Sequence, residues 1–153
     1  MKVSDILRVK GNTTLYTVTP EEPLARAIDA MADKDIGSLV VMERGELAGM
    51  LTFREVIVAI VKNGGAVGNT LVRTAMDNEP LTCTSETDLD DVRRMMLERH
   101  ARYLPVLERQ MLMGVISFYD VAKAVVDSQN FENKMLKAYI SDWPGGEGDA
   151  PRS

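Results

Sequence analysis

The hydrophobic positions of this chain change from the period of a strand to the period of a helix in a fixed order. A short alternating strand is expected at 15–18, followed by an amphipathic helix whose apolar residues fall at i, i+3, i+4 and i+7 from Leu24. The near-continuous apolar run at 38–42 is typical of a strand that is covered on both faces. A second strand at 47–51 and a second helix from Phe53 complete the order strand–helix–strand–strand–helix.

The same order of elements occurs a second time, because the chain contains an internal repeat. Residues 21–56 pair with 86–121 without a gap, and 11 of these 36 pairs are identical, where chance would give roughly two or three. One copy of about 55–60 residues would bury only a marginal core by itself, whereas two copies share one. We therefore predict an α/β (α+β) fold in which two tandem strand–helix–strand–strand–helix repeats pack sheet to sheet with pseudo-two-fold symmetry.

Helix stops and shifts in composition predict where the repeats begin and end. A short segment of similar sequence precedes each copy, and Asn63-Gly64-Gly65 is a helix stop after the first copy. The expected units are a first repeat, a linker, a second repeat, a C-terminal helix and a disordered tail rich in Pro, Gly and Asp. Their expected bounds are 3–65, 66–71, 72–127, 128–142 and 143–153, respectively.

Composition and charge narrow the class of protein. A net charge of −5 argues against a general nucleic-acid binder. No apolar run approaches the roughly 18 residues of a membrane span, and the N-terminus lacks the apolar core of a signal peptide. The single cysteine, Cys83, excludes an internal disulfide, and with the single His100 it argues against a His/Cys metal site. These features predict a cytoplasmic protein with no nucleic-acid or membrane partner.

Each copy carries the pattern Gly-x-x-[Thr/Ser]-x-x-acid, preceded by a Leu-x-Val strand. The pattern spans Gly49–Glu55 in the first copy and Gly114–Asp120 in the second, in matching strand–helix contexts. Two such motifs in register make residues 3–127 resemble a pair of CBS domains, the module named after cystathionine β-synthase. The resemblance implies ligands that contain adenosine (AMP, ADP, ATP, S-adenosylmethionine or NAD), a cleft on each side of the pair, and pairs that often dimerise.

The resemblance also assigns roles to residues of the second motif. In CBS pairs the final carboxylate of the motif usually takes the two ribose hydroxyls, and the Thr/Ser hydroxyl helps to hold ribose or phosphate; Asp120 and Ser117 match this pattern. An ionised carboxylate suits the role because it offers two acceptor oxygens to the two donors of a cis-diol. Arg102 is the first candidate for a phosphate-binding cation and Lys10 the second. The adenine wall is expected from the other copy, around Ile36, Gly37 and Ser38, with Val115 below it, and Tyr103 is a further candidate ligand-binding residue.

The first motif departs from the family pattern, because Glu55 stands in place of the usual Asp. Its extra methylene displaces the carboxylate, so the first cleft is expected to bind differently or to stay empty. By resemblance, this cleft is formed by Met50, Thr52, Arg54, Glu55 and Ala101. Both motifs also fit a second interpretation, in which Thr52-x-x-Glu55 and Ser117-x-x-Asp120 are capping boxes that begin helices.

Catalysis has little support in the sequence. A nucleophilic triad needs a base oriented by a third group, and the only histidine, His100, has no obvious serine or cysteine partner. We therefore predict a non-enzymatic signal-transduction module that binds an adenine nucleotide, AMP first, as a regulatory ligand and reports to an unknown protein partner. The alternative is a ligand-independent protein-interaction module that acts as a dimeric scaffold, with the helix around 131–140 as its docking element.

The second helix of each copy predicts a homodimer. These helices carry more apolar residues than one pair of repeats is expected to cover, namely Phe53, Val56, Ile57, Ile60, Phe118, Val121 and Val125. A large exposed apolar patch on a soluble protein usually marks an interface, and a two-fold dimer is the commonest way to cover one.

Overall fold

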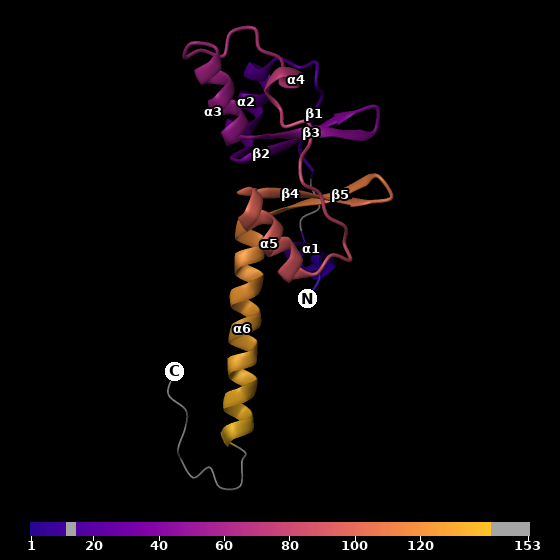
Figure 1. Cartoon of the computed structure of the whole chain (residues 1–153), viewed down its shortest axis with the longest axis vertical. Coiled ribbons are helices and arrows are strands. Elements are labelled where there is room, and N and C mark those ends of the chain that lie inside the picture. The colour runs from indigo at the N-terminus through magenta and orange to yellow at the C-terminus, as the bar shows by residue number, and fades with distance from the viewer. Residues whose placement is uncertain (12–14, 142–153) are drawn as a thin grey trace.

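The computed structural model describes residues 1–11 and 15–141 of the chain. Figure 1 shows two lobes stacked along the long axis, each with its sheet toward the other lobe and its helices on the outer side. A long helix leaves the lower lobe and runs away from both lobes. The tail predicted to be disordered, 143–153, lies outside the described residues.

The first repeat builds the upper lobe in the predicted order of elements. These are β1 (Thr17–Val18), α2 (Leu24–Lys34), β2 (Ser38–Glu43), β3 (Glu46–Thr52) and α3 (Phe53–Lys62). In the sheet, β2 lies in the middle, parallel to β1 and antiparallel to β3. Leu39, Val40 and Val41 of β2 are buried, which confirms that this strand is covered on both faces.

The second repeat builds the lower lobe in the same way. Its elements are α5 (Leu89–Arg99), β4 (Tyr103–Glu108), β5 (Met111–Ser117) and α6 (Phe118–Ser141). The register of β4 and β5 shifts between Val106 and Leu107, and that of β2 and β3 shifts between Val41 and Met42, 65 residues earlier. The repeat seen in the sequence is therefore also a repeat of the backbone, and the predicted fold of two tandem repeats is confirmed.

The repeat implies that a second copy of the strand at 15–18 falls at 81–84, and this strand is reduced to a single bridge. Cys83 pairs with β4 in parallel, donating from its N–H to the carbonyl of Pro105 at 3.0 Å and accepting from the N–H of Leu107 at 2.8 Å. The chain turns away directly afterwards, because the N–H of Thr84 donates to the hydroxyl of Thr87 at 3.1 Å.

The short segment that precedes each repeat packs in the core of the other repeat. Val3 and Ile6 of α1 (Val3–Lys10) lie in the core of the second repeat, and the N–H of Val3 donates to the carbonyl of Thr87 at 3.0 Å. Val72 of α4 (Val72–Ala75) lies in the core of the first repeat. The two lobes are thus tied together by their own chain, and α1 ends beside the second motif.

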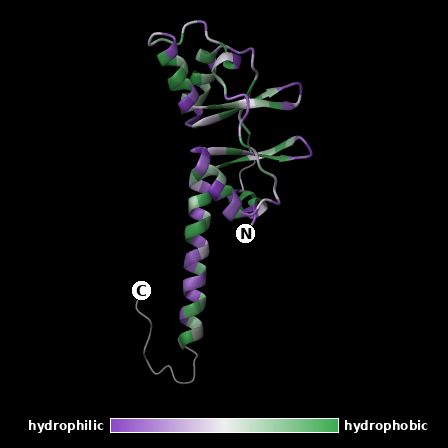
Figure 2. Cartoon of the chain, viewed as in Figure 1, coloured by the Kyte–Doolittle hydropathy of each residue, from purple (hydrophilic) through white to green (hydrophobic). Residues whose placement is uncertain are grey.

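Helix α6 is longer than the sequence pattern indicated. The expected C-terminal helix at 128–142 is helical as far as Ser141, but it is the continuation of α6 rather than a separate element. Hydrophobic residues recur along α6 beyond the lower lobe (Figure 2), and Phe131, Met135 and Leu136 are exposed there. Within residues 1–11 and 15–141, no helix is both long and apolar enough to cross a membrane.

The apolar residues expected to form a dimer interface divide into two groups. Val56 and Val121 are buried, and Ile60 and Val125 pack partly buried against the same two cores, because these positions face the sheet of their own lobe. The exposed members are Phe53, Ile57 and Phe118. On α3, Phe53 and Ile57 are 57% and 60% exposed, and Val61, which was not part of the predicted set, follows four residues later and is 71% exposed.

Candidate ligand-binding site

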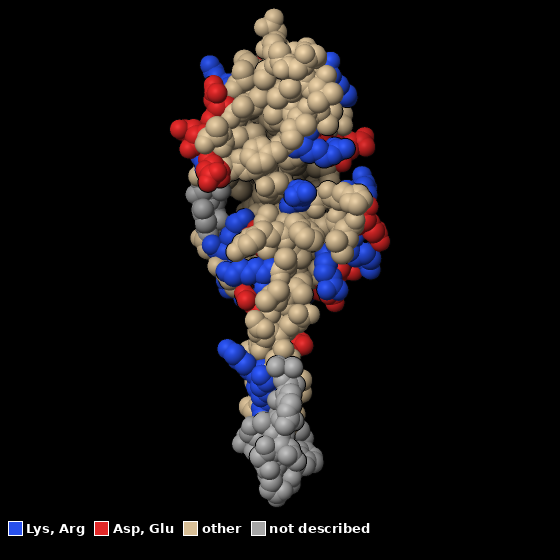
Figure 3. All heavy atoms as spheres, turned by 90° about the vertical axis from the view of Figure 1, so that its left-hand side faces the viewer, with Lys and Arg blue, Asp and Glu red and all other residues tan. Residues whose placement is uncertain are grey.

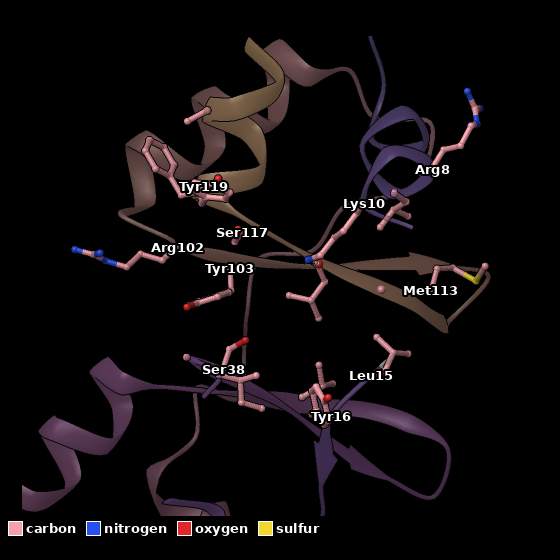
Figure 4. Close-up of a pocket in the computed structure, with 18 residues that line it drawn as sticks. Arg8, Lys10, Leu15, Tyr16, Ser38, Arg102, Tyr103, Met113, Ser117 and Tyr119 are labelled. Carbon is pink, nitrogen blue, oxygen red and sulfur yellow. Dashed lines mark hydrogen bonds between the residues drawn. The ribbon is translucent and has the colours of Figure 1, made fainter. Parts of the chain in front are cut away.

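A cavity of about 920 Å3 lies between the two sheets, with walls from both repeats (Figure 4). Its size falls within the roughly 300–1,000 Å3 of small-molecule sites. The lining residues come from α1, from the residues before β1, from β2 and the residues before it, from β4 and the residue before it, from β5, and from the start of α6. They are Leu7, Arg8, Lys10, Leu15, Tyr16, Ile36, Gly37, Ser38, Val40, Arg102, Tyr103, Met113, Gly114, Val115, Ser117, Phe118, Tyr119 and Ala122.

The structure brings most of the residues predicted for the second motif together in this cavity. Those that line it are Lys10, Ile36, Gly37, Ser38, Arg102, Tyr103, Val115 and Ser117. Asp120 is not a lining residue, but its carboxylate lies directly beside the cavity, bonded to Lys10. Residues far apart in the sequence meet here because the two sheets face each other and α1 packs on the second repeat.

The charged residues that line the cavity are basic in the part of the chain that the structure describes. Arg8, Lys10 and Arg102 line it, and none of its described lining residues is Asp or Glu, although the whole chain carries a net charge of −5. Figure 4 shows Lys10 reaching inward, whereas the guanidinium of Arg102 extends toward the outer edge. Lys and Arg side chains also gather around the waist between the lobes on the face shown in Figure 3. Such a field favours an anionic ligand.

Asp120 is held by three hydrogen bonds at the start of α6. Its Oδ2 accepts from the backbone N–H of Ser117 at 2.9 Å and from the ammonium of Lys10 at 3.0 Å. Its own N–H donates to the hydroxyl of Ser117 at 3.1 Å, so the reciprocal bonds of a capping box are present. The ammonium of Lys10 also donates to the carbonyl of Val115 at 3.0 Å. The capping interpretation is correct for this motif, and the same carboxylate stands at the edge of the cavity.

The two repeats come into close contact at the back of the cavity, where Tyr103 meets Gly37. A Cβ atom placed on Gly37 would overlap the hydroxyl of Tyr103 and would come within 3.5 Å of the ring of Phe53. Glycine is the residue that fits at this point. The ring of Tyr103 therefore reaches from the lower lobe onto the backbone of the upper lobe.

The residues expected to form a first cleft are not brought into one cavity. Met50 is buried, and its N–H and carbonyl bond to the carbonyl and N–H of Asp77 at 2.9 and 2.8 Å. The backbone of the segment after α4 thus covers β3 at Met50, whereas at Val115, the equivalent position of β5, the described part of α1 contributes the side chain of Lys10. The residues expected for the first cleft therefore do not line either described cavity together, and a ligand site there stays a prediction.

The other residues expected in the first cleft lie in different surroundings. Thr52 and Glu55 form a capping box at the start of α3, with the N–H of Thr52 donating to Oε1 of Glu55 at 2.9 Å. The side chain of Arg54 is 80% exposed and lies 3.5 Å from Glu55. Ala101 is half-buried and lines neither described cavity. Glu55 instead lines a smaller cavity of about 240 Å3 between α3 and α4.

Several lining residues were not predicted from the sequence. Phe118 and Tyr119 directly follow Ser117, so the motif itself could have pointed to them. Tyr16 stands in the predicted strand at 15–18, but its place at the boundary between lobes depends on which strand β1 pairs with. Arg8 depends on the packing of α1 against the second repeat, which no local pattern reveals.

Reactive groups are not assembled in the part of the chain that the structure describes. Burial raises the pKa of the Cys83 thiol to about 12, so this cysteine stays neutral at physiological pH and is a poor nucleophile. Among residues 1–11 and 15–141, no three His, Cys, Asp or Glu side chains lie together in a way that could hold a metal ion.

Two repeats of this architecture, joined around a common cleft, define the CBS-domain pair. The sequence profile of the CBS domain matches residues 3–62 and 72–127. The chain belongs to the CBS-domain family.

Individual relatives share this organisation over most of the chain. The mitochondrial CBS domain-containing protein CBSX3 of Arabidopsis thaliana is 30% identical over 146 residues, which are 90% of this chain and 71% of that protein. A solved protein with CBS domains from Burkholderia ambifaria is 31% identical, covering 84% of this chain and 96% of its own, with a TM-score of 0.78. The structure of CBSX2 in complex with AMP is 23% identical, covers 84% of this chain and 98% of its own, and has a TM-score of 0.69. The last similarity shows a shared fold.

Proposed function

We propose that this CBS pair is a regulatory module that binds an adenine nucleotide, AMP first, in the cavity between its two sheets. The observation that carries the proposal is the charge of that cavity: its described lining includes three basic residues and no acidic one, and the carboxylate of Asp120 stands at its edge. A nucleotide needs this combination, because its phosphate is an anion and its ribose diol is a pair of hydrogen-bond donors.

Each part of a nucleotide finds a matching group in this site. Asp120 is the acceptor for the ribose diol, and Lys10 and Arg102 are within the same cavity for the phosphate. The apolar surfaces of Ile36 and Val115 face the cavity from different repeats and suit the faces of an adenine ring. The AMP complex of CBSX2 supports this reading of the fold. ADP, ATP, NAD and S-adenosylmethionine share the adenosine part and differ in the charge beyond it.

The proposed regulation depends on the position of the ligand between the two repeats. A nucleotide that contacts both repeats favours the arrangement of lobes in which both sets of contacts form, and it shifts the population toward that arrangement by its difference in affinity. In this proposal the module is not an enzyme, acts in the cytoplasm, and passes the change to a protein partner.

A ligand panel tests the proposed function by thermal unfolding. AMP, ATP, NAD and S-adenosylmethionine are each added to the full chain, with GMP as the matched control that changes the base alone. At 100 times its dissociation constant a ligand stabilises the folded state by about 2.7 kcal/mol, which for a chain of this size raises the melting temperature by roughly 5–10 °C. We expect such a rise for AMP and a smaller one for GMP. No rise with any ligand would contradict the proposal.

The same panel also tests a ligand-independent scaffold. The exposed apolar residues Phe131, Met135 and Leu136 on α6 beyond the lower lobe favour this second candidate, since they offer a surface to another protein. A chain that binds no member of the panel would support the scaffold over the nucleotide sensor.

The proposed module acts as a homodimer through the exposed stripe of α3. Phe53, Ile57 and Val61 would be covered in a two-fold pair. Sedimentation equilibrium at micromolar concentration is expected to give about 34 kDa, twice the 16.9 kDa of one chain. Ile57→Glu is expected to give about 17 kDa. Met111→Glu, at an equally exposed apolar residue on the β4–β5 hairpin, should leave the dimer intact. A wild-type mass near 17 kDa would refute this interface.

A further inference from the structure

We infer that the ammonium of Lys10 competes with the ribose hydroxyls of the ligand for the carboxylate of Asp120. Lys10 thereby selects phosphorylated adenosine over adenosine itself. In the free protein its ammonium pairs with the carboxylate of Asp120. When a nucleotide binds, the ammonium leaves that carboxylate and pairs with the phosphate of the ligand. The inference rests on the proposed function, because it specifies how the same cavity distinguishes one adenosine ligand from another.

The contacts of Lys10 place its ammonium against the carboxylate of Asp120, which is the proposed acceptor for the ribose diol. Its ammonium lies 3.0 Å from Oδ2 of Asp120 and 3.0 Å from the carbonyl oxygen of Val115. The same Oδ2 already accepts the N–H of Ser117 at 2.9 Å. A diol that approaches Asp120 with both hydroxyls therefore meets an oxygen that is engaged twice, and the contact that can leave without breaking the helix cap is the one from Lys10.

The position of Lys10 in the fold allows this exchange. It is the last residue of α1, and Gly11 follows in the left-handed conformation with φ of 66°. The Lys10 side chain is 36% exposed and that of Asp120 is 17% exposed. An ion pair that is partly open to water is weak, and the flexible stem of lysine allows the ammonium to move while the backbone stays in place. The charge can thus change partners within the cavity.

In the first repeat, main chain covers the position that is equivalent to Val115. At the position equivalent to Val115, Met50 exchanges two backbone hydrogen bonds with Asp77. A ligand would have to remove a segment of main chain there, whereas at Val115 it has to move one side chain. The larger described cavity lies on the side of the second motif.

The exchange has a different consequence for charged and neutral ligands. A phosphate monoester carries about −1.5 to −2 charges at neutral pH, so AMP gives Lys10 a new and stronger partner when it leaves Asp120. Adenosine displaces the same ammonium and offers it no anion. Lys10 therefore opposes adenosine and supports AMP.

Removing the charge of Lys10 tests the inference by its opposite effects on two ligands. Binding of AMP and of adenosine is measured by calorimetry on the full chain, for the wild type and for Lys10→Met, which keeps the length of the stem. We expect AMP to bind about 10- to 150-fold more weakly and adenosine to bind as tightly or up to about 5-fold more tightly. Lys10→Arg retains the charge and is expected to keep the preference for AMP.

Lys2→Met is the matched control, because the ammonium of Lys2 also pairs with a carboxylate, that of Glu86 at 2.9 Å, but Lys2 is not among the residues that line the cavity. It is expected to leave the affinity for adenosine unchanged and to weaken AMP less than Lys10→Met does. Equal weakening of both ligands by Lys10→Met, or an unchanged ratio between them, would overturn the inference while leaving the proposed function in place. A wild-type chain that binds neither ligand would overturn both.

Discussion

Asp120→Asn is expected to lose about half or more of the rise in melting temperature that AMP produces, while its ligand-free fold remains. The amide keeps one acceptor oxygen but loses the second acceptor and the charge, both of which a ribose diol uses. Losing such a charge-assisted bond weakens binding by roughly 1.5–3 kcal/mol, or about 10- to 150-fold in dissociation constant. Thermal unfolding at one fixed AMP concentration, chosen at about 100 times the wild-type dissociation constant, measures this loss directly.

The control for this variant separates ligand binding from helix capping. Glu55→Gln changes the corresponding residue of the capping box on α3, which does not line the cavity between the sheets. Each variant is expected to lose at most about 1 kcal/mol of stability without ligand, but Glu55→Gln should retain the full response to AMP. If Asp120→Asn also retained the full response, its carboxylate would only cap α6, and the assignment of the ribose site would be wrong.

Gly49→Ala is expected to destabilise the chain strongly, by about 1–3 kcal/mol. A Cβ atom at this position would stand 2.5 Å from the carbonyl oxygen of Asp77. That oxygen accepts the N–H of Met50 at 2.9 Å, so it belongs to a backbone pairing that cannot move aside alone. For a chain of this size the melting temperature should fall by roughly 3–10 °C, which differential scanning calorimetry measures.

Gly114→Ala is the matched control, since the repeat places Gly114 at the equivalent position of β5. Its Cβ atom would meet a terminal methyl carbon of Leu7 at 3.1 Å, the end of a side chain with room to rotate. We expect a loss of less than about 1 kcal/mol. Equal losses for the two variants would mean that the backbone pairing of Asp77 is not what distinguishes the first repeat from the second.

Those features of the fold that arise from local periodicity could be predicted from the sequence. The apolar stripe from Leu24 indicates a helix, and the continuous apolar run at 38–42 indicates a strand covered on both faces. Each pattern lies within a short stretch of the chain. The shared spacing of 65 residues then places the second repeat. The continuity of α6 could also have been predicted from the sequence, because no Gly or Pro occurs between Phe118 and Ser141 to end a helix.

Features that depend on which segments meet in space could not be predicted in this way. Val3 and Val72 have similar local sequences, yet each packs in the core of the repeat that it does not precede. The pairing of Asp77 with Met50 is equally invisible, since no period or motif marks the segment after α4. For this reason the sequence predicted two clefts, and the structure assembles the expected residues of the second motif alone.

We propose that one adenine nucleotide binds per chain, in the cavity beside Asp120, and isothermal titration of the full chain with AMP tests this stoichiometry. We expect a single class of site with one AMP per chain, since the residues expected for the first cleft do not line either described cavity together. Two identical sites per chain, or no saturable binding of AMP, would contradict it.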